Sequence, residues 1–229
     1  MKNKFLLCLL LAVIACNMSA FAQEIKTPKQ AIKALVKGNE RFMKDHSIHP
    51  HEGMQRVKSL IGSQKPFAAV VACSDSRVPV ELLFDCGFGD IFVIRTAGNT
   101  VIDDSTLGSV DYAINHLGVQ VVVVLGHTHC GAITAVTELG KAHDEHDGHH
   151  HISAEDDKYV TKLITRISED IPDYVGKTEC LDEAIAANTK VQLDILLSVP
   201  HIAKSIEEGE LAVVSANYDI ETGLVTFDK

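Results

Sequence analysis

Short apolar runs alternate with longer segments of mixed apolar and polar residues along most of the chain. The runs cover residues 67–72, 91–95, 120–125 and 211–215. Their length and mainly apolar character are typical of strands buried in a parallel sheet. The segments between and beside them have the length and spacing of helices, at 79–83, 105–117, 131–139, 158–171 and 180–197. This alternation predicts an α/β domain of three layers, with a mainly parallel central sheet flanked by helices.

One more helix is expected before the first strand. Thr27 is a favourable N-cap residue, and Pro28 suits the first helical position because no backbone N–H is needed there. Apolar residues at helical spacing continue to about Lys44, and a polar, histidine-containing loop follows. Residues 23–229 are therefore expected to form a single domain.

The first 22 residues have the pattern of a secretory signal peptide. Lys2 and Lys4 supply a positive start, and residues 5–15 form an apolar stretch too short to span a bilayer. The tripeptide Ala20-Phe21-Ala22 fits a cleavage site. The pattern predicts a signal peptide at 1–22 and a periplasmic or secreted mature chain without a transmembrane segment.

Two other interpretations of this leader stay open. In the first interpretation, residues 1–22 are a membrane anchor. In the second, the run Val13-Ile14-Ala15-Cys16 resembles a bacterial lipoprotein box, and Cys16 is lipidated. Export into an oxidising compartment would favour disulfides among the remaining cysteines.

Charge and composition exclude one large class of partner. Hydrophobic residues make up 46% of the chain, which is typical of a globular protein. The formal net charge is −10, and no aromatic-rich basic patch is present. Because nucleic-acid phosphates are bound by basic surfaces, this balance argues against a nucleic-acid partner.

Two short motifs carry metal-binding chemistry. The first is Cys73-Ser74-Asp75-Ser76-Arg77, and the second is His127-Thr128-His129-Cys130; each follows an apolar run. Parallel α/β sheets gather their functional residues at the carboxyl ends of the strands. Two cysteines and one histidine leave a tetrahedral Zn²⁺ one ligand short, as in a catalytic zinc site.

Together the two motifs resemble the signature of the β-class carbonic anhydrases. Residues 91–99 and the final 211–227 resemble further segments of that family, so the likeness covers roughly residues 28–228. It implies one Zn²⁺ per chain, held by Cys73, His127 and Cys130, and zinc-dependent reversible hydration of CO₂ to bicarbonate and a proton. It also implies a homodimer or a dimer of dimers, with the pocket at the dimer interface.

The resemblance assigns catalytic roles to Asp75 and Arg77. Arg77 would hold the carboxylate of Asp75, which would accept a hydrogen bond from the attacking water or hydroxide and orient it. In a closed state Asp75 would instead become the fourth zinc ligand. On the residues alone, the pair could also be a solvent-exposed salt bridge of little energetic value. His129, although it lies inside the second motif, is not expected to be a ligand.

Four further residues match substrate-pocket positions of the family: Gln64, Phe92, Tyr112 and Gly131. Gly131 would offer its backbone N–H. The alternative is that Phe92 and Tyr112 are ordinary core residues and that Gln64 lies on the surface. Val70 stands where the bicarbonate-inhibited subtype has a tryptophan, which puts that noncatalytic bicarbonate site in doubt.

Some cysteines and histidines leave other possibilities open. Cys73 and Cys130 could form a disulfide, and Cys86 could pair with Cys180 or remain a buried free thiol. The histidine-rich loop at 143–151 is a solvated loop or a weak metal-capture segment. Two alternative functions follow: a noncatalytic periplasmic zinc-binding protein that uses this loop, and a hydrolase of carbonyl sulfide or carbon disulfide.

Overall fold

The computed structural model describes residues 25–140 and 157–228. The expected signal peptide (1–22) and the histidine-rich loop (143–151) lie outside the described residues. None of the helices in the two described ranges has both the length and the apolar character needed to cross a bilayer.

The centre of the fold is a five-stranded sheet. Its strands are β1 (Ala68–Cys73), β2 (Ile91–Thr96), β3 (Val121–His127), β4 (Ala212–Tyr218) and β5 (Val225–Phe227). They lie in the order β2-β1-β3-β4-β5, and only β5 runs antiparallel, against β4. The predicted mainly parallel sheet is therefore confirmed, and β2 is one of its two edges.

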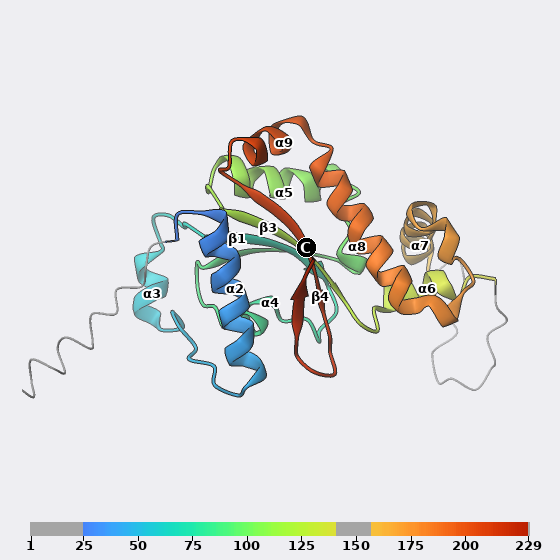
Figure 1. Cartoon of the computed structure of the whole chain (residues 1–229), viewed down its shortest axis with the longest axis horizontal. Coiled ribbons are helices and arrows are strands. Elements are labelled where there is room, and N and C mark those ends of the chain that lie inside the picture. Colours follow the sequence, from blue (N-terminus) through green and yellow to red (C-terminus); the bar gives the residue numbers. More distant parts are fainter. Residues whose placement is uncertain (1–24, 141–156, 229) are drawn as a thin grey trace, which may run out of the picture.

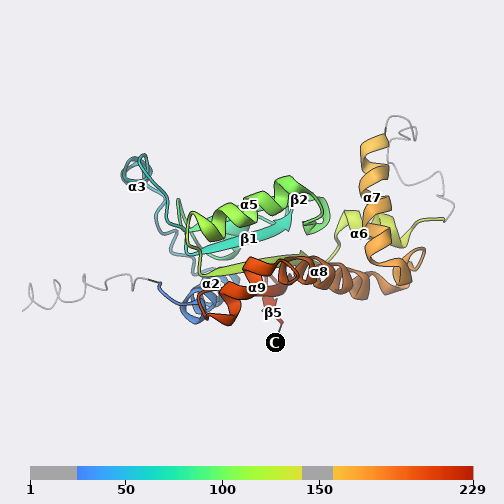
Figure 2. The same cartoon turned by 90° about the horizontal axis from the view of Figure 1, so that it is seen from above.

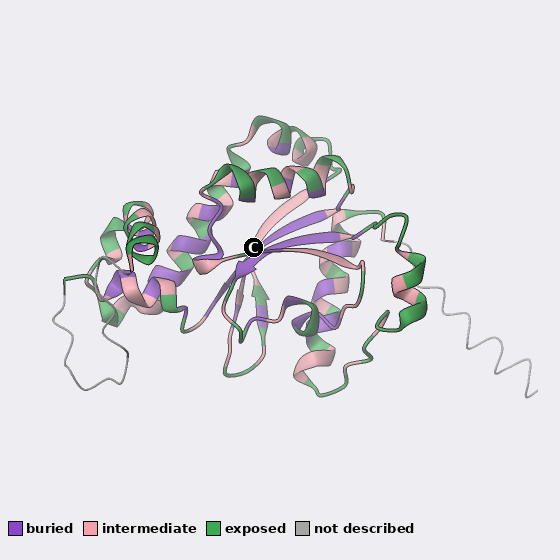
Figure 3. Ribbon diagram, turned by 180° about the vertical axis from the view of Figure 1, so that it is seen from behind, coloured by how far each residue is buried: buried purple, intermediate pink, exposed green. Residues whose placement is uncertain are grey.

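Helices cover both faces of the sheet, as the three-layer prediction requires. The helices α2 (Pro28–Met43) and α4 (Val80–Leu83) pack on one face. The other face carries α5 (Asp104–Asn115), α8 (Leu181–Leu197) and α9 (Pro200–Glu207). Figure 1 shows α5 and α9 on the opposite side of the strands from α2 and α4. Every residue of β1 and β3 is buried between the two helical layers, and Figure 3 shows the buried central strands in purple. This burial on both faces explains why the two strands are continuous apolar runs in the sequence.

The two ends of the sheet carry different structures. At the carboxyl ends, α6 (Gly131–Thr137), α7 (Lys158–Asp170) and the start of α8 form a separate small core. The short helix α3 (Met54–Ser59) lies at the opposite end (Figure 2). Three 3₁₀ turns complete the described elements: η1 (Ala97–Asn99), η2 (Pro172–Tyr174) and η3 (Thr178–Cys180). The carboxyl end of the sheet is thus enclosed by helices.

Local sequence signals account for the starts of α2 and α5. The side chain of Thr27 accepts a hydrogen bond from the backbone N–H of Gln30, and Pro28 begins α2. Asp103 caps α5 by accepting from the backbone N–H of Thr106 at 2.8 Å. Since both caps satisfy a helix N–H that would otherwise lack a partner, they fix where the helices start.

Two helices were not predicted. Helix α3 has six residues, buries none of them and starts at a glycine without a side-chain cap, so its sequence resembles the polar loop expected there. Helix α9 begins with Pro200 in its first turn and buries Ile202. The proline was a usable signal, because proline is favoured at the first helical position.

Candidate metal centre

Neighbouring parallel strands bring the two motifs together. Cys73 is the last residue of β1, and His127 is the last residue of β3. The two strands pair directly, with Ala72 opposite Leu125, so their carboxyl ends meet. Cys130 follows after a short turn and immediately precedes α6. The Sγ atoms of the two cysteines and a ring nitrogen of His127 lie within 4.8 Å of one another, and all three residues are buried.

The orientation of His127 fits a metal ligand. Its Nδ1 lies 2.9 Å from the carbonyl oxygen of Thr128, which identifies Nδ1 as the protonated nitrogen that donates. Nε2 is buried and has no hydrogen-bond partner. Buried polar atoms normally have a partner, and an imidazole fixed through one nitrogen is the usual arrangement around a bound metal.

The two cysteine sulfurs lie close together without a covalent bond. Their Sγ atoms are 4.0 Å apart, too far for a disulfide, and both cysteines are free, as are Cys86 and Cys180. The hydrogen bond from Cys130 lowers the pKa of Cys73 to about 4, with help from His127 and from the backbone of Asp75 and Gly98. The same coupling, together with burial, raises the pKa of Cys130. Without a cation only one of the two sulfurs is readily ionised, since two adjacent thiolates repel each other.

Asp75 and Arg77 form a tight pair beside this group. Arg77 donates from Nε to Oδ1 at 3.0 Å and from Nη2 to Oδ2 at 2.7 Å, and its backbone N–H also donates to Oδ1. These bonds hold the pKa of Asp75 at about 2. The carboxylate is not part of the group of three possible ligands, and Arg77 binds both of its oxygens.

Two arginines bind backbone carbonyl oxygens around the site. Arg77 connects the two motif loops, and Arg95 connects the first motif to β2. Arg77 Nη2 donates to the carbonyl oxygen of His129 at 3.0 Å, which links the first motif to the second. Arg95, at the end of β2, donates to the carbonyl oxygens of Cys73 and Asp75 at 3.0 and 2.5 Å. The sequence analysis gave Arg95 no role. Two signals were present: its place at the carboxyl end of a strand and its position within the segment 91–99 that resembles the family.

His129 lies near the site but outside the ligand group. Its backbone is in the left-handed region, with φ of 57°, and its exposed ring lies 3.5 Å from Glu221. The sequence interpretation that His129 is not a ligand is consistent with this placement.

Of the four predicted pocket residues, the structure brings only Gly131 to the metal centre. It is the first residue of α6, directly after Cys130. Phe92 pairs with Ala69, four residues before Cys73, which corresponds to about 13 Å along the strand. Tyr112 on α5 lies against Phe92, with ring centroids 6.2 Å apart.

Gln64 is also remote from the metal centre of its own chain. It is exposed in the loop between α3 and the start of β1, at the amino end of the sheet. Gln64, Phe92 and Tyr112 therefore lie away from the carboxyl end at which Cys73 and His127 meet.

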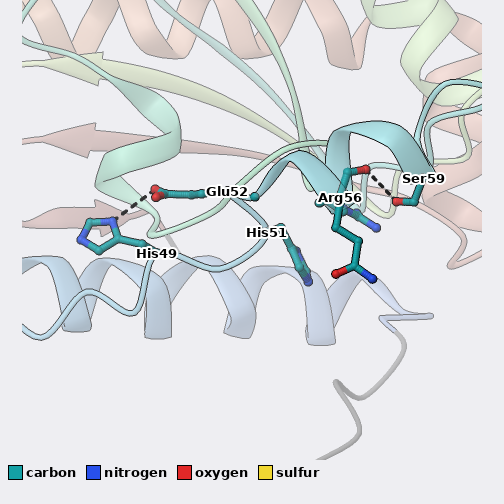
Figure 4. Close-up of a pocket in the computed structure, with 7 residues that line it drawn as sticks. His49, His51, Glu52, Arg56 and Ser59 are labelled. Atoms are coloured by element: carbon teal, nitrogen blue, oxygen red, sulfur yellow. Dashed lines mark hydrogen bonds and ion pairs between the residues drawn. The ribbon is translucent and has the colours of Figure 1, made fainter.

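A separate hollow of about 510 Å³ contains two histidines but is not a second centre of the same kind. His49 Nδ1 lies 3.3 Å from Glu52, and both oxygens of Asp90 lie 2.8 Å from His51 Nδ1. Figure 4 shows the imidazoles of His49 and His51 pointing in different directions. Within the described parts of the chain, only Cys73, His127 and Cys130 form a group of three or more metal-ligating side chains.

Comparisons with known proteins identify the family that has this fold. Residues 68–225 match the family model described as carbonic anhydrase. A carbonic anhydrase of Mycolicibacterium smegmatis is 38% identical over 204 residues, which cover 86% of this chain and 92% of that protein.

Two solved structures share the fold. The β-carbonic anhydrase of Coccomyxa, in complex with acetazolamide, has a TM-score of 0.62 at 23% identity and covers 86% of this chain and 85% of its own. One of two tetrameric β-carbonic anhydrases from Sordaria macrospora has a TM-score of 0.59 at 26% identity, over 86% and 95% of the two chains.

The fold and the sequence matches together define a lyase built on a mainly parallel α/β sheet. The chain belongs to the β-class carbonic anhydrase family. Its activity is the reversible hydration of CO₂ to bicarbonate and a proton.

Proposed function

We propose that Cys73, His127 and Cys130 hold one Zn²⁺ per chain and that this ion serves CO₂ hydration. The observation that carries the proposal is the buried Nε2 of His127, which lacks a partner in a group that includes two cysteine sulfurs. Two sulfurs and one imidazole suit zinc and leave one coordination position for the reaction. When bound, zinc supplies Lewis acidity, which lets water act as a nucleophile near neutral pH.

Asp75 is the residue that would orient the attacking water. Because Arg77 holds its pKa at about 2, Asp75 is ionised at neutral pH and can only accept hydrogen bonds. Because Arg77 donates to both carboxylate oxygens of Asp75, it fixes the direction of the lone pairs that remain free on those oxygens. A water held by this carboxylate would be aimed at the carbon of CO₂, and such positioning accounts for much of enzymatic rate enhancement.

The same pair argues against a zinc store. A storage site needs ligands but no oriented carboxylate beside them. Here Arg77 donates hydrogen bonds to both oxygens of Asp75. Arg77 also binds the backbone carbonyl oxygen of His129, and Arg95 binds that of Cys73. Stopped-flow measurement of CO₂ hydration on metal-analysed protein tests the assignment, and hydration by zinc-free protein would contradict it.

We propose further that two chains build each pocket. Gln64, Phe92 and Tyr112 lie too far from their own metal centre to line it, yet all three match substrate-pocket positions. Tyr112 is 45% exposed, and β2, which carries Phe92, is an edge strand. A second copy seated on this edge would offer these residues to its neighbour. The tetrameric relative from Sordaria macrospora supports assembly of this kind.

Mixed dimers test this arrangement. Cys73→Ser should remove the metal centre and leave Gln64 intact, whereas Gln64→Ala should leave the metal centre intact and remove the amide. If sites form across the interface, refolding the two inactive variants together restores one complete site in each mixed dimer. Random pairing makes half of the dimers mixed, so activity should return to about a quarter of the wild-type rate.

The matched comparison combines both changes in one chain and refolds it with wild type. In that mixed dimer neither site is complete if residues act across the interface, although one would be complete if they act within a chain. Failure of the first mixture to regain activity would contradict the shared pocket.

We also propose that the chain is exported and that cleavage follows Ala22. Lys2, Lys4 and the apolar stretch 5–15 support this, together with the small residues at the cleavage site. Protein recovered from the periplasm of an expressing bacterium should have the mass of residues 23–229. Retention of residues 1–22, or a lipid on Cys16, would contradict cleavage at this position.

A further inference from the structure

Helix α8 contains two fully buried amide side chains that the catalytic proposal does not use. Asn188 and Gln192 are one turn apart and have no exposed surface. Gln192 Nε2 donates to Asn188 Oδ1 at 3.3 Å, so the two form a short relay. Burying an amide side chain costs free energy unless it is hydrogen-bonded. If this face of α8 served only for packing, hydrophobic residues could fill the same space without that cost.

The relay ends on the backbone beside the metal centre. Gln192 Oε1 accepts from the backbone N–H of Val101 at 2.8 Å, and Asn188 Nδ2 donates to the carbonyl oxygen of Gly98 at 2.9 Å. Gly98 lies within η1, the turn that follows β2, and Val101 lies two residues after that turn. Two side chains of α8 thus hold the stretch 97–101 at two points, Gly98 and Val101.

This stretch lies directly beside Cys73. The residue before it, Thr96, pairs with Cys73 in the sheet, and its carbonyl oxygen accepts from the backbone N–H of Ser74 at 2.9 Å. Residues of η1 also contact β1, the strand that ends at Cys73. Gly98 has φ of 69°, and a Cβ there would lie only 3.2–3.3 Å from Ile167 and Ala132, so its backbone has little room to shift.

The same face of α8 reaches the second motif. Thr189, next to Asn188, packs against Gly126, where an added Cβ would lie 2.2 Å from its Oγ1. Gly126 precedes His127 in β3. In Figure 1, α8 runs from the sheet towards the α6–α7 end of the molecule. One helix face therefore supports the segments that carry two of the three ligands.

We propose that Asn188 and Gln192 are positioning residues of the metal centre. Through Gly98 and Val101 they hold the backbone that follows Thr96, the residue paired with Cys73, and this sets how tightly the site binds zinc. The inference rests on the zinc site proposed above. Neither residue touches a ligand directly, so both act through the intervening backbone.

The test is the zinc affinity of purified full-length variants, measured by competition with a chromophoric chelator. Asn188→Ala removes the donor to Gly98, and Gln192→Met removes both amide contacts at nearly constant length. Each variant should bind zinc about 10- to 100-fold more weakly, the usual effect of losing an outer support of a metal ligand. In cobalt-substituted protein, the sulfur-to-cobalt charge-transfer absorption should also shift.

Leu196→Ala is the matched control. Leu196 lies on the same helix, is fully buried and belongs to the hydrophobic core on that face of the sheet. Its loss should lower stability without changing zinc affinity or the cobalt spectrum. Wild-type affinity and spectrum in Gln192→Met, or an equal loss in Leu196→Ala, would overturn the proposal. If wild-type protein and Cys73→Ser bind zinc equally, the proposed zinc site itself fails instead.

Discussion

Cys73→Ser should remove zinc and CO₂ hydration together. A serine hydroxyl does not ionise near neutral pH, so the site loses one of its two sulfur ligands and keeps only His127 and Cys130. Loss of a support behind a ligand costs about 10- to 100-fold, so loss of a ligand should lower the hydration rate by more than about 100-fold. Metal analysis and stopped-flow hydration on the same preparation check both parts.

Cys86→Ser is the matched control for this change. Cys86 is also a free cysteine, but burial raises the pKa of its thiol to about 12, and its Sγ donates to the carbonyl oxygen of Phe84. A serine can donate the same bond. Zinc content and hydration should therefore remain at wild-type levels. Full activity in a zinc-free Cys73→Ser protein would contradict the metal centre described here.

Changes to the Asp75–Arg77 pair should lower hydration while zinc stays bound. Asp75→Asn keeps the size of the side chain but replaces the charged acceptor that orients water. The rate should fall by roughly 10²-fold or more, the usual contribution of a positioned acid, base or orienting group. Arg77→Ala should cause a similar loss by a different route. It frees the carboxylate, whose pKa then rises towards its ordinary value of 3.8, so that it is still ionised at neutral pH and can bind the cation.

The two variants should respond differently to pH. Hydroxide competes better with a carboxylate for the cation as pH rises, so Arg77→Ala should recover part of its rate in alkali. Asp75→Asn has no carboxylate to displace and should not recover. A crystal structure of Arg77→Ala at neutral pH should have Asp75 as the fourth ligand.

A second ion pair provides the control. Arg166 and Asp170 on α7 lie 2.6 Å apart and are not members of the group of three ligands. Arg166→Ala and Asp170→Asn should leave the pH profile of hydration unchanged. Wild-type rates across pH in both Asp75→Asn and Arg77→Ala would reduce that pair to a structural salt bridge.

The sheet was predictable from sequence because its central strands are buried on both faces. In β1 and β3 every residue is apolar or belongs to the metal site, so the runs stand out against their surroundings. The same fact locates the ligands, since a polar residue directly after such a run lies at a strand end. Helix α3 could not be recognised in this way, because it buries nothing and lacks a cap.

Contacts between segments far apart in the chain were harder to predict from the sequence. Asn188 and Gln192 are four residues apart on α8, on the same face as the buried Ile185 and Leu196. Polar residues on an apolar face were a usable signal for a buried network, but not for its partners in the stretch 97–101. For Gln64 the sequence indicated a role, but the fold of one chain does not explain it. The resemblance gave it a role, whereas a single chain does not bring it to the metal.

The most direct test of the central claim follows hydration as zinc is restored to metal-free protein. Stopped-flow CO₂ hydration by the wild-type chain should rise in proportion to added zinc and level off at about one equivalent per chain. Cys73→Ser measured in parallel should remain at the uncatalysed rate throughout. Full hydration before zinc is added, or no hydration when one equivalent is bound, would contradict the assignment of Cys73, His127 and Cys130 as the catalytic zinc site.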